Sequence, residues 1–127
     1  MAEAAAPTPR ELEILKVLWE IGPASVRDVY RRLAQAQEEE LAYNTVQTLL
    51  RIMEEKNLVQ HQVEGRAFIY SPLYTREASV RGFLNQVFDG ATDQLVMTLL
   101  RTERLSAREL ERLQAMIEEA RQKKAAR

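Results

Sequence analysis

The sequence has 127 residues, 46% of them hydrophobic, with 18 Lys and Arg against 19 Asp and Glu. A chain of this length can form one or two small domains with a real core, which argues against extensive disorder. It contains no cysteine, which excludes structural disulfides, thiolate metal sites and a cysteine nucleophile, and favours a reducing cytoplasm.

The charge is divided unevenly along the chain. Residues 1–72 carry 8 Lys and Arg against 11 Asp and Glu, whereas residues 73–127 carry 10 against 8. A protein that binds nucleic acid usually has a basic balance, so the composition argues mildly against that function. Any contact with nucleic acid must therefore depend on where individual basic residues lie.

Nothing near the N-terminus predicts export. Residues 1–7 are Ala-rich, without the basic segment and apolar core of a secretory signal, and we expect them to be flexible. No apolar run approaches the roughly 18 residues that indicate a membrane span. We expect a cytoplasmic protein without membrane insertion.

Two helices are predicted at the start of the chain. Thr8 and Glu11 have the spacing of a capping box, with a proline at the first helical position. Gly22 ends this helix, and Ser25 offers the cap of a second one. Residues 37–40, which are mainly acidic, are expected to form a loop. The apolar residues with helical spacing are Leu12, Leu15, Leu18 and Trp19 in the first helix, and Val26, Val29, Tyr30 and Leu33 in the second.

A third helix and a β-hairpin are predicted next. The helix covers residues 43–56, because its apolar residues recur at helical spacing and predict one buried face. Two strands follow at residues 58–63 and 67–71, both rich in β-branched or aromatic residues. Gly65 lies between them and can take the positive φ that a tight hairpin turn often needs. The apolar residues of the helix are Val46, Leu49, Leu50 and Met53.

Three more helices are predicted after the hairpin. Thr75 is expected to cap the first, which runs to about Phe88, and Thr92 is expected to cap a short second one. Ser106 and Glu109 have the spacing of a capping box that opens the last helix.

The order of elements predicts a mainly α fold with two parts. Three helices followed by a β-hairpin wing are typical of a winged helix-turn-helix domain, which we place at residues 8–73. The seam lies at residues 71–75. Residues 74–127 are then expected to form a helical dimerisation region.

The outward face of the third predicted helix is suited to reading DNA. In a winged helix this helix enters the major groove, and the hairpin lies against the flanking backbone. Asn and Gln can bond to adenine, Thr offers a hydroxyl and a methyl group, and Arg favours guanine or phosphate. The predicted DNA-binding residues are Ser25, Tyr43, Asn44, Thr45, Gln47, Thr48, Arg51 and Arg66. Of these, Ser25 and Arg66 are expected to contact the backbone or the minor groove.

A second interpretation stays open. Polar residues on an outer helix face are usually only solvated, and Glu54 and Glu55 would repel phosphate if they faced it. The alternative is a winged-helix adaptor that binds protein and no DNA. Affinity for duplex DNA that falls steeply with rising salt would separate the two.

The C-terminal helices are too small to enclose a core of their own, which implies a partner surface. The simplest partner is a second copy in a two-fold dimer, and the alternative is that these helices fold back on the N-terminal ones. A dimer would set two recognition helices about 34 Å apart, as a palindrome requires. The residues expected to be buried in it are Phe83, Leu84, Val87, Leu95, Leu99, Leu110, Leu113 and Ile117.

No motif predicts an enzyme. His61 is the only histidine and falls in a predicted strand, where a wing or surface role is far more common than catalysis or metal binding. No Gly-rich phosphate loop or metal-ligand spacing occurs, so we expect no cofactor and no metal.

The chain resembles the penicillinase-repressor (BlaI/MecI-type) family of winged-helix transcriptional repressors. The segments that match, in family order, are ELEILKVLWEIGPASVRDVYRRL, LAYNTVQTLLRIMEEKNLV, EGRAFIYSPLYTREA, FDGATDQLVMTLL and LSARELERL. The resemblance implies a homodimer that binds a palindromic operator and blocks transcription. It also implies relief by a membrane-bound sensor protease that cuts the repressor between Thr98 and Leu99, where the staphylococcal repressors have Asn-Phe. The lack of cysteine excludes the family's copper-responsive branch.

Overall fold

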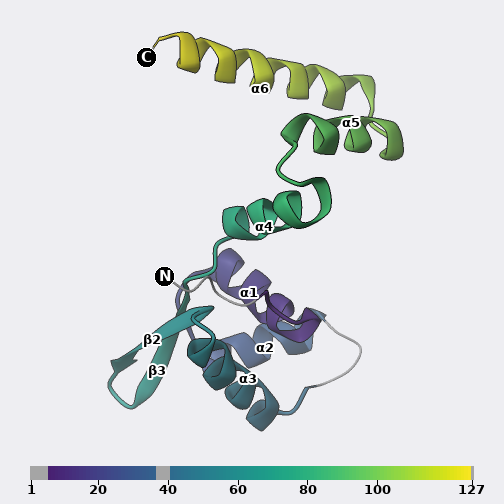
Figure 1. Ribbon diagram of the computed structural model, residues 1–127. Helices are drawn as coiled ribbons and strands as arrows, with labels where there is room; N and C mark the ends of the chain where they lie inside the picture. The colour runs from purple at the N-terminus through teal and green to yellow at the C-terminus, as the bar shows by residue number, and fades with distance from the viewer. Residues whose placement is uncertain (1–5, 37–40, 127) are drawn as a thin grey trace. The chain divides into compact units, whose positions relative to one another are not determined.

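The computed structural model describes residues 6–36 and 41–126. The elements follow one another as α1 (Pro9–Ile21), β1 (Ala24–Ser25), α2 (Val26–Ala36), α3 (Tyr43–Glu55), β2 (Val59–Glu64), β3 (Ala67–Pro72), α4 (Arg76–Phe88), α5 (Thr92–Thr102) and α6 (Ala107–Ala125) (Figure 1). The predicted mainly α, winged-helix fold is confirmed. The expected loop at 37–40, and most of the N-terminus expected to be flexible, lie outside the described residues.

Side-chain caps begin four of the predicted helices, among them α2, where the Ser25 hydroxyl accepts from the Asp28 amide. The Thr8 hydroxyl accepts from the Glu11 amide at 3.2 Å, and the Glu11 carboxylate accepts from the Thr8 amide at 2.8 Å. Ser106 and Glu109 repeat this capping box at the start of α6. Thr75 accepts from the amide of residue 78 at the start of α4. Each start therefore follows from the local sequence.

The predicted cap at Thr92 is wrong. Thr92 is already the first residue of α5, and the cap position is Ala91, which forms no side-chain cap. The helix already includes Thr92, so the Thr92 hydroxyl is not at the position from which a cap accepts hydrogen bonds from the first amide groups of the helix.

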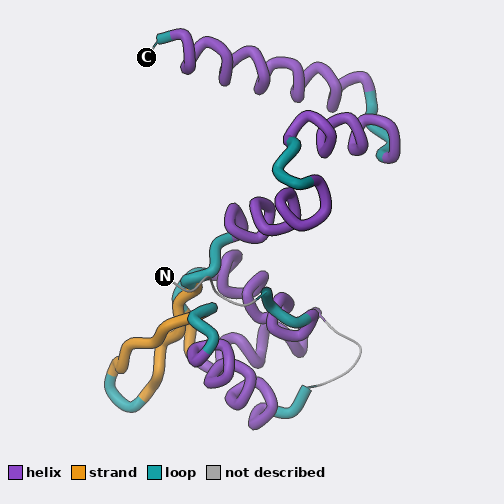
Figure 2. The backbone as a smooth tube through the Cα atoms, viewed as in Figure 1, coloured by secondary structure: helices purple, strands orange, loops and turns teal. Residues whose placement is uncertain are grey.

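The sheet has a third strand that the sequence did not indicate. Its order is β1-β3-β2, and all pairs are antiparallel. β1 is only two residues long, too short to show an alternating pattern. β2 and β3 pair from Val59 opposite Pro72 to Glu64 opposite Ala67, and Gly65 adopts φ 62° in the turn. Figure 2 shows this hairpin projecting beyond α1, α2 and α3, with the turn at its far end.

The core lies between α1, α2, α3 and the inner end of the sheet. Three of the four apolar residues predicted for α3 are fully buried, and Leu49 packs against them from the edge. Leu12 has the spacing of a core residue but is 36% exposed. The core residues are Ile14, Leu15, Val17, Leu18, Ala24, Val26, Val29, Leu33, Val46, Leu50, Met53, Leu58, Val59 and Tyr70.

A buried ion pair joins the start of α1 to the end of α3. Glu11 is 1% exposed, and both of its carboxylate oxygens accept from the Lys56 ammonium, at 2.9 and 3.0 Å. Burial raises the pKa of Glu11, but the Thr8 amide and the Lys56 ammonium lower it further, so that this pKa lies below its usual 4.5. The carboxylate is therefore charged in the folded domain at neutral pH.

The chain divides into two compact units, Met1–Phe83 and Leu84–Arg127. The sequence places the seam earlier, at residues 71–75, where the last strand ends. The first unit extends further because the segment after β3 is held on α1. The Trp19 indole donates to the Tyr74 carbonyl at 2.9 Å, and the Arg76 guanidinium lies 5.4 Å from the centre of the Trp19 ring.

The C-terminal elements bury none of their described residues. No side chain of α4, α5 or α6 is buried, although each helix carries several large apolar residues. An amphipathic helix normally gains most of its stability by packing its apolar face. No helix among the described residues has the length and apolar character needed to cross a membrane.

Candidate nucleic-acid interface

A groove of about 490 Å³ lies between α3, the hairpin and the start of α2. Five of the predicted DNA-binding residues line it: Ser25, Tyr43, Gln47, Arg51 and Arg66. Three of them come from α3 at positions i, i+4 and i+8, so they form one row along the helix. The fold therefore brings residues of three separate segments to one surface.

The remaining predicted residues lie elsewhere on α3. Asn44, Thr45 and Thr48 are exposed, but they do not line the groove. Asn44 and Thr48 form a neighbouring row at i, i+4 spacing. The outward face of α3 is thus wider than the groove, and both rows are accessible from outside.

The groove carries unbalanced positive charge. Three arginines line it, Arg27, Arg51 and Arg66, and none of the described residues that line it is acidic. None of these arginines forms an ion pair with a carboxylate in the described part of the chain. Positive charge focused in a concave surface attracts a polyanion.

Several acidic residues of the winged-helix unit are paired with other side chains and do not line the groove. Glu11 is buried against Lys56, Glu20 pairs with Arg32, and Glu54 pairs with His61. This placement explains how a segment with an acidic balance can present a basic surface. Glu54, whose charge raises the pKa of the groove residue Tyr70, is bonded to His61 of the hairpin and does not itself line the groove.

Of the two helices that begin at the groove, α2 has a side-chain cap and α3 has none. The Ser25 hydroxyl accepts from the Asp28 amide at 3.1 Å and so caps α2. α3 begins after Ala42, which forms no side-chain cap. The amide groups at this positive end of the helix dipole therefore have no side-chain cap, and such a helix end favours an anion. Tyr43, beside them, packs edge-on against Tyr30 at 5.6 Å between ring centres.

Five residues that line the groove are not among the predicted DNA-binding residues: Val26, Arg27, Ala67, Phe68 and Tyr70. Arg27 follows Ser25 by two residues, in a stretch interpreted only as a helix start. Phe68 and Tyr70 alternate with Ile69 along β3 and so share one face, a period-two signal that was present in the sequence. Burial raises the pKa of Tyr70, as does the charge of Glu54, so its phenol stays protonated at neutral pH.

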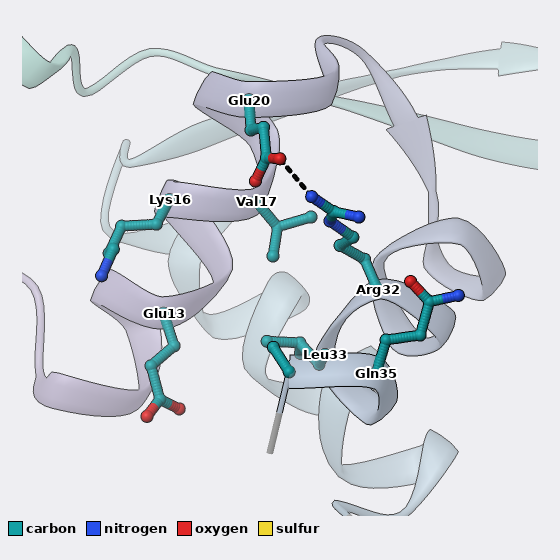
Figure 3. A pocket seen from close by; sticks show the side chains of 8 residues that line it. Glu13, Lys16, Val17, Glu20, Arg32, Leu33 and Gln35 are labelled. Atoms are coloured by element: carbon teal, nitrogen blue, oxygen red, sulfur yellow. Dashed lines mark hydrogen bonds and ion pairs between the residues drawn. The ribbon is translucent and has the colours of Figure 1, made fainter.

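A second hollow, of about 660 Å³, lies between α1 and α2 (Figure 3). Val17 and Leu33 form its floor, and the Arg32 guanidinium donates to the Glu20 carboxylate across it. Positive and negative side chains both surround it, so it lacks the net positive charge of the groove. Its other lining residues are Glu13, Lys16, Gln35 and Ala36.

The residues predicted for dimerisation are mostly exposed within one chain. Leu84 and Leu95 are half-buried. The rest are at least 39% exposed: Phe83, Val87, Leu99, Leu110, Leu113 and Ile117. Those of α6 follow one another at i, i+3 and i+7, which places them on one face of that helix.

The predicted cleavage position lies inside a helix. Thr98 and Leu99 are in α5, and the Thr98 hydroxyl donates to the Gln94 carbonyl at 2.7 Å. Leu99 is exposed. A protease binds its substrate in an extended form, so cleavage here requires this part of α5 to unwind.

Comparison with known proteins identifies a family match over most of the chain. The penicillinase repressor family profile matches residues 7–119. The penicillinase repressor of Bacillus licheniformis is 29% identical over 118 residues, which are 90% of this chain and 91% of that protein. The transcriptional regulator BlaI of Mycobacterium tuberculosis is 33% identical over 84 residues, 65% of this chain and 59% of that regulator.

Solved structures agree with this similarity. The solution structure of the monomeric form of Bacillus licheniformis BlaI in complex with the blaP half-operator is 27% identical, with a TM-score of 0.51, over 61% of this chain and 93% of that one. A MarR family protein from Bacillus stearothermophilus has a TM-score of 0.51 at 19% identity, over 95% of this chain and 77% of that one. The similarity to the MarR family protein concerns the fold alone.

Proposed function

Because the chain belongs to the penicillinase repressor family, we propose that it is a DNA-binding transcriptional repressor that acts as a homodimer on a palindromic operator. The observation that carries the proposal is the groove between α3 and the hairpin, which Arg27, Arg51 and Arg66 line together and where none of the described lining residues is acidic. The solved structure of a relative bound to a half-operator supports it.

Residues of α3 and of the hairpin have different roles in DNA binding. Gln47 and Arg51 line the groove, while Asn44 and Thr48 lie on the outer side of the same helix. With α3 in the major groove, amide and guanidinium groups read base edges by paired hydrogen bonds. Arg66, at the end of the hairpin, contacts the phosphate backbone, which contributes affinity without sequence preference.

In the proposed dimer, the apolar faces of α5 and α6 form the interface. Leu99, Leu110, Leu113 and Ile117 are exposed on helices that bury nothing in one chain. A second copy related by a two-fold axis covers the same residues on both chains. It also presents two copies of α3 to one duplex, which suits a palindrome.

We also propose that repression is relieved by proteolytic cleavage in α5. A cut between Thr98 and Leu99, made by a membrane-bound sensor protease, removes α6 from the winged-helix unit and so weakens operator binding. The test is incubation of the chain with membranes that contain the sensor protease encoded nearest to its gene. Mass spectrometry of the products locates the cut, and a cut outside α5 contradicts this part of the proposal.

Binding to duplex DNA should depend steeply on salt. Neutralising phosphates releases counterions, so the logarithm of the binding constant should fall linearly with the logarithm of salt concentration. The measurement is a fluorescence anisotropy titration with a duplex selected by the wild-type chain from a random pool. A protein-binding adaptor would show no such slope.

Arg51→Ala should weaken binding to the selected duplex by about 1 to 3 kcal/mol and relax its sequence preference, as expected for a base contact. Arg32→Ala is the matched control, since it removes the same charge from α2 on the side where Arg32 pairs with Glu20. Equal effects of the two variants would contradict the assignment of Arg51.

Arg66→Ala should weaken binding alike on the selected duplex and on mixed-sequence DNA. It should also reduce the salt slope by about one, the value for one lost phosphate contact. Arg32→Ala again serves as the control, and an unchanged slope would remove Arg66 from the interface.

A further inference from the structure

A side-chain hydrogen bond links α3 to the hairpin beside the groove. His61 on β2 has its Nδ1 at 2.6 and 2.7 Å from the two carboxylate oxygens of Glu54 on α3. A carboxylate only accepts hydrogen bonds, so this nitrogen carries the proton and donates it. The side chains are 28% and 33% exposed, which shields the bond partly from water.

The same histidine supports one wall of the groove. Its ring stacks on the ring of Phe68 from β3, with 4.2 Å between ring centres and an angle of 16° between the planes. Phe68 lines the groove. Glu54, His61 and Phe68 therefore form a continuous row from α3 to the groove wall, which we call the wing clamp.

The wing clamp lies where the hairpin begins to extend beyond the rest of the winged-helix unit. At its base, the Leu58 carbonyl accepts from the amides of Leu73 and Tyr74, at 2.9 and 3.0 Å. β1 pairs with β3 only at Ile69 and Tyr70. Residues 62–68 lie beyond these supports and are all exposed. The direction of the outer hairpin thus depends on what holds it near His61.

We propose that the wing clamp sets the position of Arg66 relative to Arg51, which makes His61 a positioning residue for operator binding. This inference rests on the proposed function. Three strand residues separate His61 from the turn, a distance of about 10 Å. A tilt of about 10° at His61 would move the end of such an arm by roughly 2 Å, more than a hydrogen bond to phosphate tolerates.

The first test replaces His61 and measures binding to the selected duplex across a salt series. His61→Ala removes both the donor to Glu54 and the ring beneath Phe68. We expect binding about tenfold weaker and a salt slope lower by about one, as for Arg66→Ala, because the phosphate contact at the hairpin end is lost. Gln60→Ala is the matched control, since Gln60 is exposed and precedes His61 on the opposite face of β2.

A double-mutant cycle shows whether His61 acts through the hairpin end. If it does, His61→Ala added to Arg66→Ala should cause no further loss, since the contact that it positions is already absent. The conservative Glu54→Gln keeps an oxygen that accepts from His61 and should bind within about threefold of wild type. Glu54→Ala has no acceptor and should behave as His61→Ala does.

Folding of each variant is checked by thermal unfolding before binding is measured. Should His61→Ala not fold, His61→Phe retains a ring against Phe68 and removes only the donor. Wild-type affinity and slope in the variant that folds, or losses that multiply in the double variant, would overturn the clamp and leave the proposed function intact. A wild-type chain without salt-dependent binding to duplex DNA would overturn both.

Discussion

Leu113→Glu is expected to convert the protein into a monomer and to weaken operator binding by roughly a hundredfold or more, as loss of bivalent binding does. Leu113 lies on the apolar face of α6 and is 39% exposed in one chain. In a dimer its side chain is covered by the partner, and a carboxylate at that position would lose its hydration without gaining a charge partner. Each monomer would then hold the DNA through a single winged helix.

Sedimentation equilibrium measures this directly. The wild-type mass should be near twice 14.6 kDa and that of the variant near 14.6 kDa. Gln114→Glu is the matched control, because it introduces the same charge at the next residue of α6, off the apolar row. A wild-type chain that is monomeric at micromolar concentration would contradict both the dimer and the symmetric operator.

The second large effect is expected at the ion pair of the winged-helix unit. Glu11→Ala should lower the free energy of unfolding by about 2 to 3 kcal/mol, since it removes the carboxylate half of the capping box of α1 and leaves Lys56 without its buried partner. Glu11 is almost fully buried, whereas the Lys56 side chain is 32% exposed, so water compensates part of the loss. Urea unfolding followed by the fluorescence of Trp19, the only tryptophan, measures it.

An exposed ion pair on the same helix provides the comparison. Glu13 pairs with Arg10 at 3.1 Å, and both side chains are about two-fifths exposed. Glu13→Ala should therefore change stability by no more than about 0.5 kcal/mol. A loss as large as that of Glu11→Ala would mean that burial of Glu11 is not what makes its ion pair important.

The contribution of Glu11 should also depend on pH. Its pKa is lower in the folded domain than its ordinary value of 4.5, so its stabilising effect is fully present above pH 4.5 and is lost as the pH falls through the folded pKa. The stability difference between the wild type and Glu11→Ala should shrink below pH 4.5. A difference that stays constant into the acid range would contradict this linkage.

Most element boundaries were predictable because their signals are local. A hydroxyl three residues before a glutamate marks the start of α1 and of α6, and a glycine between two β-branched runs marks the hairpin turn. The apolar spacing of α3 predicts its buried side, and its outer side follows by exclusion. The family resemblance depends on the same residues in the same order, and the profile match over residues 7–119 confirms it.

The assembled surface was not predictable in the same way. Arg27, Phe68 and Tyr70 join the groove because α2 and β3 pack beside α3. The ion pair between Glu11 and Lys56 connects residues 45 positions apart, and nothing near either residue predicts it. Local sequence specifies backbone conformation through short-range contacts. Contacts between distant segments arise only once the core has packed, and those contacts explain how an acidic segment presents a basic groove.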